Sequence, residues 1–214
     1  MIFYNPTEND VLTSWIRYNP KSTFIMTQLG GIKSIDVVAI MDQLSTQLTN
    51  RNIQQLDANS LVTGRDFQSK IWKLALSVPI GIAVVSETMP QSTIANIFYE
   101  LGLMNALGKE TMVIKTQDFL IPSDFIRTEY IEYDDNFENK FTNFLDQVLD
   151  QAEYYRILAD NLIAKPLLSM DYLRRAYLIT GENSHKQRAI QIIDENEFDE
   201  HLLLMIRSYF NIQN

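Results

Sequence analysis

The sequence predicts a flavodoxin-like α/β fold, in which a parallel five-stranded sheet of order 2-1-3-4-5 is followed by a C-terminal helical extension. Short apolar segments typical of strands alternate with segments of helical periodicity, which is the pattern of βαβ units and hence of a parallel sheet. The segment 80–86 (IGIAVVS) is apolar throughout, as expected of a central parallel strand covered on both faces. Right-handed crossovers between five such strands give this strand order most simply.

The first predicted element is a short helix over residues 7–18. Thr7 is a suitable N-cap, apolar side chains follow at helical spacing, and the Asn19–Pro20 pair ends the pattern. The first strand is predicted at 22–29 because this segment is apolar and ends at two consecutive glycines. The chain therefore enters the sheet from an N-terminal helical segment.

Two more helices and a strand precede the central strand. Residues 34–50 and 65–77 carry apolar side chains at helical spacing, and the short stretch 53–58 between them is a weaker extended segment. After the central strand, residues 92–107 form a helical pattern that Gly108 ends as a C-terminal cap.

The last strands are predicted at 111–116 and 129–133, and helices follow them to the end of the chain. Residues 137–164 have a long helical pattern that fits one helix or two in succession, and Pro166 and Gly181 punctuate further helices. The chain is thus expected to consist of three parts. They are an N-terminal helical segment (1–21), an α/β domain (22–150) and a helical tail (151–214).

Composition excludes several classes of function. The 214 residues have a formal net charge of −9, which disfavours duplex nucleic acid as a partner because such binding depends on clustered lysines and arginines. The chain has no cysteine, so disulfides and thiolate metal sites are excluded and a cytoplasmic location is expected. We see no secretory signal, no membrane-spanning run and no metal-ligand spacing for the 2 histidines, and we predict neither a metal nor another cofactor.

The fold class locates a candidate ligand site. Ligands of doubly wound sheets bind beyond the carboxyl ends of the strands, at the point where the strand order reverses. Here that point lies between the first and third strands, so the segments after residues 26 and 85 and the helix starting near Ser92 should form it. Thr27 and Gln28 precede two glycines where a phosphate or ribose could lie, although an ordinary strand-to-helix turn has the same pattern.

One helix motif suggests a family. Residues 95–109 read ANIFYELGLMNALGK and are followed by the apolar segment TMVIKT. This motif resembles the nucleoside 2-deoxyribosyltransferase-like and TIR-like nucleotide-binding domains, whose helix reads close to N-V-F-Y-E-L-G-x-A-x-A-L-G-K. Looser similarity extends over about residues 22–150 and leaves the tail unexplained.

The resemblance implies a catalytic role for Glu100. In the deoxyribosyltransferases the helix glutamate attacks the sugar C1′ carbon, and in TIR-type NADases a glutamate on the corresponding helix supports cleavage of the nicotinamide–ribose bond. A carboxylate beside the anomeric carbon can stabilise or trap the oxocarbenium character of such a reaction. Glu100 flanks the predicted apolar stripe of its helix, where it could also be a solvated residue or a salt-bridge partner.

Further residues are expected to line the same site. The family often has an aspartate just after the third strand, and Glu87 in the loop that begins at Ser86 would take its place. Asn96 lies one helical turn before Glu100. Two weaker candidates are Asp57, which matches an acidic position of the family after the second strand, and Tyr99, which would stack on a base unless it is a packing residue.

Three functions remain open at this stage. The first is binding of a nucleotide or nucleoside with cleavage or transfer of an N-glycosidic bond. The second is a non-catalytic nucleotide sensor or protein-interaction module that assembles through its helical tail, which is rich in aromatic side chains and could close over the sheet or bind a second copy of the chain. The third and weakest is a flavin-binding protein, which a yellow chromophore would reveal.

Overall fold

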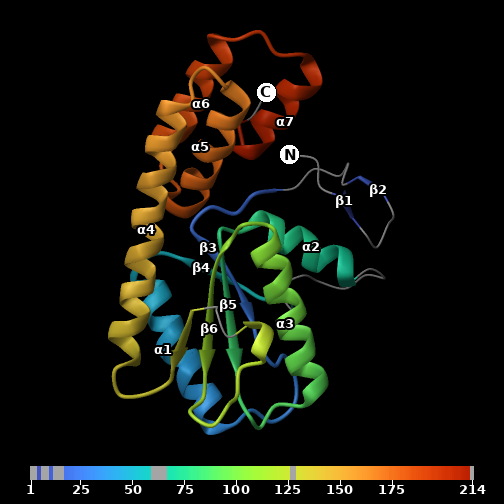
Figure 1. Ribbon diagram of the computed structural model, residues 1–214, viewed down its shortest axis with the longest axis vertical. Coiled ribbons are helices and arrows are strands. Elements are labelled where there is room, and N and C mark those ends of the chain that lie inside the picture. Colours follow the sequence, from blue (N-terminus) through green and yellow to red (C-terminus); the bar gives the residue numbers. More distant parts are fainter. Residues whose placement is uncertain (1–3, 6–9, 12–16, 59–66, 126–128, 213–214) are drawn as a thin grey trace.

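A parallel five-stranded sheet forms the centre of the molecule (Figure 1). The computed structural model describes residues 4–5, 10–11, 17–58, 67–125 and 129–212. Its sheet has the order β4-β3-β5-β6-β7, with every neighbouring pair parallel, which is the predicted order 2-1-3-4-5. The strands are β3 (Ser22–Met26), β4 (Gln54–Leu56), β5 (Ile80–Val85), β6 (Glu110–Lys115) and β7 (Tyr130–Glu132).

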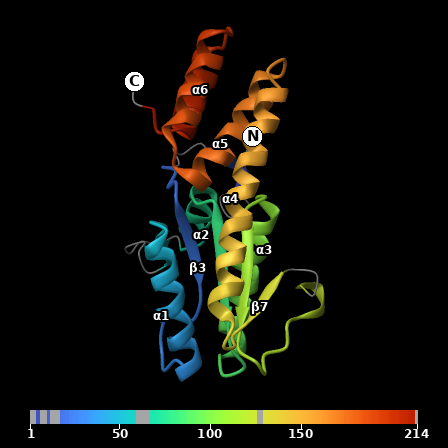
Figure 2. The same ribbon diagram turned by 90° about the vertical axis from the view of Figure 1, so that its left-hand side faces the viewer.

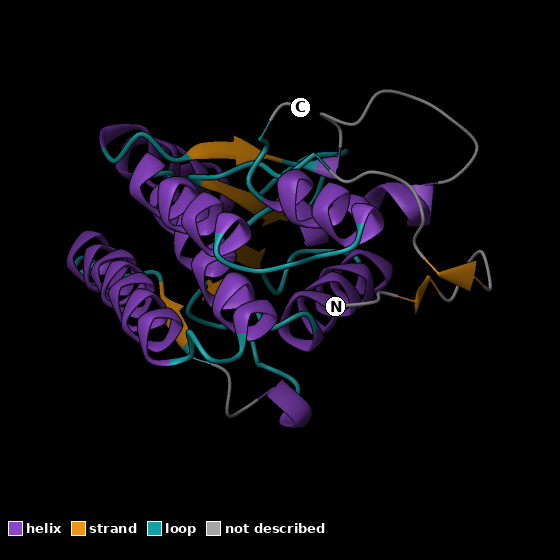
Figure 3. Ribbon diagram, turned by 90° about the horizontal axis from the view of Figure 1, so that it is seen from above, coloured by secondary structure: helices purple, strands orange, loops and turns teal. Residues whose placement is uncertain are grey.

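Helices cover both faces of this sheet (Figures 2 and 3). Helices α1 (Ile35–Asn50) and α4 (Phe137–Asn161) lie on one face, and α2 (Phe67–Ser77) and α3 (Gln91–Ala106) lie on the other. Burial on both faces explains why β5 is apolar throughout, since all its residues are buried. The flavodoxin-like α/β prediction is confirmed.

The predicted helix ends agree closely with the structure, and capping residues fix them. The Ser34 hydroxyl accepts a hydrogen bond from the Val37 amide at the start of α1. Gly108 follows α3 with a φ of +65°, which only glycine adopts without strain. Pro166 occupies the first turn of α5 (Pro166–Thr180), where its missing N–H is not needed.

The predicted helix over residues 7–18 is wrong for the part of it that is described. Asp10 and Val11 form the short strand β2 (Asp10–Val11), which pairs antiparallel with β1 (Tyr4–Asn5), and residues 17–18 are not helical. Residues 7–9 and 12–16 lie outside the described residues. A helix of this length is marginal unless its apolar face packs, so a local pattern alone was a weak basis for it.

The helical tail stands at the amino ends of the strands (Figure 1). It contains α5, α6 (Asn183–Asp194) and α7 (Glu200–Tyr209), and its own apolar core includes Tyr18 from the segment before β3. Helix α4 joins the two parts, because its residues up to Ala152 belong to the core of the sheet and Ala159 belongs to the core of the tail. The expected boundary at residue 150 therefore falls inside a continuous helix.

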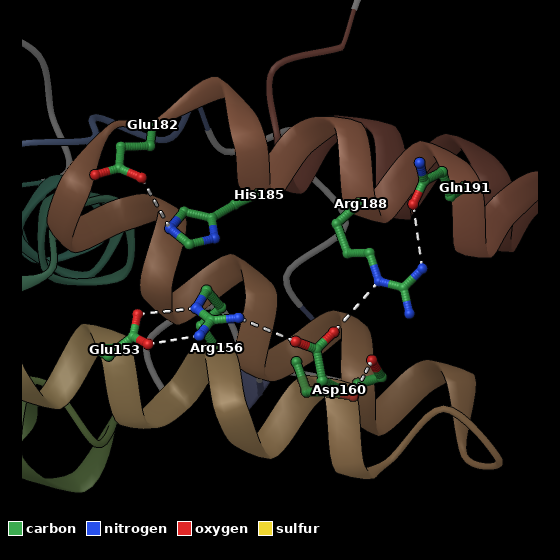
Figure 4. Close-up of polar contacts among 9 residues, drawn as sticks. Glu153, Arg156, Asp160, Glu182, His185, Arg188 and Gln191 are labelled. Carbon is green, nitrogen blue, oxygen red and sulfur yellow. Dashed lines mark hydrogen bonds and ion pairs between the residues drawn. The ribbon is translucent and has the colours of Figure 1, made fainter.

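Polar contacts also connect α4 with the tail (Figure 4). The Arg156 guanidinium pairs with Glu153 and Asp160, and Asp160 in turn pairs with Arg188 of α6. Among the helices that the structure describes, none combines the length and the apolar composition needed to cross a membrane.

Candidate functional site

A network of hydroxyl groups and one carboxylate lies at the carboxyl ends of β5 and β6. The Thr116 hydroxyl donates a hydrogen bond of 2.5 Å to Oε2 of Glu87, and the buried Ser86 hydroxyl lies 3.4 Å from the same oxygen. Ser86 Oγ also lies 3.0 Å from the Thr88 hydroxyl and accepts a bond from the Thr88 amide at 3.3 Å. The turn after β5 is thereby tied to the turn after β6.

Glu87 is the exposed member of this network. The hydrogen bond from Thr116 lowers the pKa of the Glu87 carboxyl below its ordinary value, because the bond stabilises the ionised form. Both hydrogen bonds that this carboxylate accepts from other described residues reach Oε2. Oε1 is therefore a charged acceptor available to a hydroxyl or amine of a ligand.

Lys115 at the end of β6 supports the turn that contains Thr116. Its ammonium group, nearly buried, pairs with Glu132 of β7 at 2.7 Å and donates to the carbonyls of Thr116 at 3.4 Å and Gln117 at 3.1 Å. The Tyr130 ring lies 5.7 Å away. Sequence analysis missed both Lys115 and Thr116, although their position at the end of a predicted strand was a signal that could have found them.

Thr27 and Gln28 follow β3, the neighbour of β5. The Thr27 side chain is 8% exposed, and its hydroxyl has no hydrogen-bond partner among the described residues. Gln28 turns back on its own loop, where its amide donates to the Gly30 carbonyl at 2.7 Å. This loop leads into the N-terminus of α1, whose first amides and positive dipole end suit a phosphate group.

Glu100 lies on the flank of α3 that is turned toward α2. Phe98 contacts Phe125 on the opposite flank, with ring centroids 4.7 Å apart, and a residue two positions further along an α-helix lies roughly 160° away around its axis. Leu101 and Met104 between the two flanks are fully buried against the sheet. Glu100 therefore borders the seam between α2 and α3, which is the flanking position that the sequence predicts.

The Glu100 carboxyl has an unusual environment. The side chain is partly buried, and it has no hydrogen-bond or ion-pair partner among the described residues. Burial raises the pKa of Glu100 to about 7, since the ionised form loses its hydration without gaining a partner. A carboxyl group that titrates near neutral pH can act as an acid, a base or a nucleophile.

The remaining predicted residues lie on α3 and after β4. Asn96 and Tyr99 are exposed on α3, and Asp57 is half-buried after β4, one strand beyond β3. Asn105 near the end of α3 is exposed and accepts a hydrogen bond from Thr111 at 2.6 Å. The structure thus brings Ser86 and Glu87 together, with Thr27 on the neighbouring strand, while Asn96, Tyr99 and Glu100 share one helix.

Other features of the described residues lie apart from this edge. Two hollows of about 480 and 510 Å³ lie beside β6 and α4 and share Glu129, Phe144 and Gln147 in their walls. In the described part of the chain no three His, Asp or Glu side chains come together as a metal site.

No model of a known protein family matches the sequence, and no curated protein matches it either. The resemblance of residues 95–109 to the deoxyribosyltransferase-like and TIR-like helix therefore stays a prediction.

Proposed function

We propose that this chain binds a nucleotide or nucleoside at the carboxyl edge of its sheet and cleaves or transfers the N-glycosidic bond. The single observation that carries the proposal is Glu100, a partly buried carboxyl with a pKa of about 7 and no partner among the described residues. Burying a carboxyl group without a partner costs stability. Groups whose pKa is strongly shifted in this way are more frequent at functional sites than elsewhere. This carboxylate would either attack the anomeric carbon as a nucleophile or stabilise the positive charge that develops there in an oxocarbenium-like transition state.

The carboxyl edge supplies the binding groups that such a substrate needs. The loop after β3 offers a phosphate the Thr27 hydroxyl at its start, and the positive end of the α1 dipole at its end. Sugar hydroxyls or base amines fit the Glu87 carboxylate, which accepts hydrogen bonds and repels a phosphate. Donors and acceptors are thus separated along the edge.

Incubation with NAD and with the four deoxynucleosides, followed by chromatography of released base, tests the proposal. The variant Glu100→Gln keeps the size of the side chain and removes its charge and nucleophile. We expect it to lower the rate at least about 100-fold. Glu197→Gln, at an exposed glutamate of the tail, is the matched control and should retain the wild-type rate. Equal rates for wild type and Glu100→Gln would remove Glu100 from the mechanism.

A non-catalytic sensor that assembles through its tail is the second candidate. It is favoured by apolar side chains that α4 and α5 expose around their connection. They are Tyr154, Ile157, Ile163, Leu167 and Leu168. This candidate predicts thermal stabilisation by a nucleotide without release of base, together with a dimer or larger assembly in light scattering that Ile157→Ser and Leu168→Ser dissociate.

A further inference from the structure

The turn after β6 is built to hold one hydroxyl group in place. The Thr116 amide donates to the Val85 carbonyl of β5, and the Thr116 carbonyl accepts from the Phe119 amide, both at 3.2 Å. The Lys115 ammonium adds bonds to the carbonyls of Thr116 and Gln117. These bonds fix the backbone of the turn and hence the position from which the Thr116 side chain donates.

That direction is the Glu87 carboxylate, on a different turn 29 residues away along the chain. The bond is short, at 2.5 Å, and ties up Oε2, while Oε1 accepts no side-chain hydrogen bond from another described residue. An exposed glutamate normally samples several rotamers, and ordering it costs conformational entropy when it binds. Here the hydrogen bond from Thr116 orders the Glu87 side chain before a ligand binds, so binding does not lose this entropy.

We propose that Thr116 is a positioning residue, which orients Glu87 so that Oε1 accepts hydrogen bonds from the sugar hydroxyls or base amine of the bound nucleotide. This role rests on the proposed function, because it needs a nucleotide at the carboxyl edge. Lys115 acts one step further away, since it fixes the turn that presents the Thr116 hydroxyl.

The Glu132 carboxylate compensates the charge of Lys115, so this lysine does not compete for Glu87. Among the described residues, the side chains that bond to the Glu87 carboxylate are the neutral hydroxyls of Ser86 and Thr116. The bond from Thr116 is the largest of the effects that lower the pKa of Glu87, ahead of its own backbone amide and Ser86. Its removal should move the titration of this carboxyl toward its ordinary range.

The full chain with Thr116→Val, which loses the hydroxyl at nearly constant shape, is the direct test, and Thr116→Ser, which keeps the hydroxyl, is its control. The probes are the four ribonucleoside 5′-monophosphates, measured by calorimetry from pH 4 to pH 8. With the best-bound probe we expect Thr116→Val to weaken binding about tenfold at neutral pH. Its affinity should also begin to fall at a higher pH on acidification than that of wild type, whereas Thr116→Ser should follow wild type.

A shift of the pH profile separates positioning from mere support of the fold, because a purely structural loss would weaken binding equally at every pH. The titration of the Glu87 carboxyl in carbon NMR spectra gives the same comparison without a ligand. If wild type and Thr116→Val bind the probe with the same affinity and pH profile, the positioning role is wrong and the proposed function survives. If wild type binds none of the probes, the proposed function itself fails and this role fails with it.

Discussion

Two glutamates of this protein have opposite environments although they lie only 13 positions apart in the sequence. A hydrogen bond from Thr116 lowers the pKa of Glu87, whereas burial raises the pKa of Glu100 to about 7. Glu87 follows β5 at the carboxyl edge of the sheet, whereas Glu100 lies more than half-way along α3, which runs from that edge toward the amino ends of the strands. Glu87 is suited to accept hydrogen bonds at every physiological pH, and Glu100 is suited to gain or lose a proton.

The raised pKa of Glu100 also predicts how stability depends on pH. In the unfolded chain this carboxyl titrates near 4.5, and in the folded protein it titrates near 7. The folded state therefore keeps a proton that the unfolded state loses between these values, so stability falls as the pH rises through this window. The loss is complete above pH 7 and amounts to something on the order of 3 kcal/mol.

Glu100→Gln removes this loss because its amide does not ionise. Urea unfolding at pH 8 should show the variant to be more stable than wild type, while at pH 4 the two proteins should have nearly the same stability. Glu197→Gln, at an exposed site, should follow wild type at both values. A variant no more stable than wild type at pH 8 would show that the Glu100 carboxyl is hydrated or has a partner.

At the scale of elements, the strands and helices of the α/β part were predictable because several signals agree along the chain. Ser34 and Gly108 mark helix ends by their chemistry, and the apolar character of 80–86 marks a strand buried on both faces. The segment 7–18 had only an amphipathic pattern, and no packing partner could be read from the sequence. The sequence therefore predicted those elements for which capping residues mark the ends and the apolar pattern marks the buried face.

The candidate site was predictable only in part, for a related reason. Strand order places the loops after β3 and β5 at one edge, so Thr27, Ser86 and Glu87 could be found from topology. The bond between Thr116 and Glu87 depends on the geometry of two turns, which no spacing along the chain encodes. Burial of Glu100 depends in the same way on how α2 packs beside α3.

The close approach of α3 to β5 leads to a prediction at this scale. A Cβ atom on Gly81 would lie 2.9 Å from Cε and 3.1 Å from Cγ of Met104, and 3.1 Å from Cε of Met26, and both methionines are buried. Gly81→Ala should therefore lower stability because Met104 must shift, and the larger, branched side chain of Gly81→Val should push α3 from the sheet and cost more, about 1 to 3 kcal/mol in urea unfolding. Equal stability of the two variants would contradict this packing.

At the scale of the whole molecule, Arg175 of the tail contacts the end of α3, where its guanidinium donates to the Gly108 carbonyl at 3.2 Å. A cation at the C-terminus of a helix is favourable because carbonyl groups there lack partners and the dipole is negative. Within the α/β part, Lys109 donates to the Leu76 carbonyl of α2 at 2.8 Å, and burial lowers the pKa of this lysine well below its ordinary value. The Lys109 of the ALGK motif thus has a structural use at the end opposite to the candidate site.

Asp171 holds this junction together. Its carboxylate pairs with Arg174 at 2.7 Å and with Arg175 at 3.2 Å. The Arg174 guanidinium is buried between the rings of Tyr18 and Tyr209, and its Nε has no partner among the described residues. Although burial opposes ionisation, the two guanidinium groups keep the pKa of Asp171 below its ordinary value. Asp171→Asn should therefore leave a buried charge unpaired and cost about 3 to 5 kcal/mol at neutral pH.

Unfolding of this variant reveals whether sheet and tail form one cooperative unit. With Trp15→Phe as background, Trp72 is the sole tryptophan and reports on α2, while circular dichroism reports on all helices. Because both cores share α4, we expect the two signals to change together in wild type and in Asp171→Asn, at a lower urea concentration in the variant. Glu153→Gln, which breaks an exposed pair with Arg156 (Figure 4), should change the stability much less than Asp171→Asn does. The difference in free energy of unfolding between Asp171→Asn and wild type should shrink as the pH falls below the pKa of Asp171, since the wild-type carboxyl then takes up a proton. A circular-dichroism transition that precedes the Trp72 signal would show instead that the tail unfolds alone.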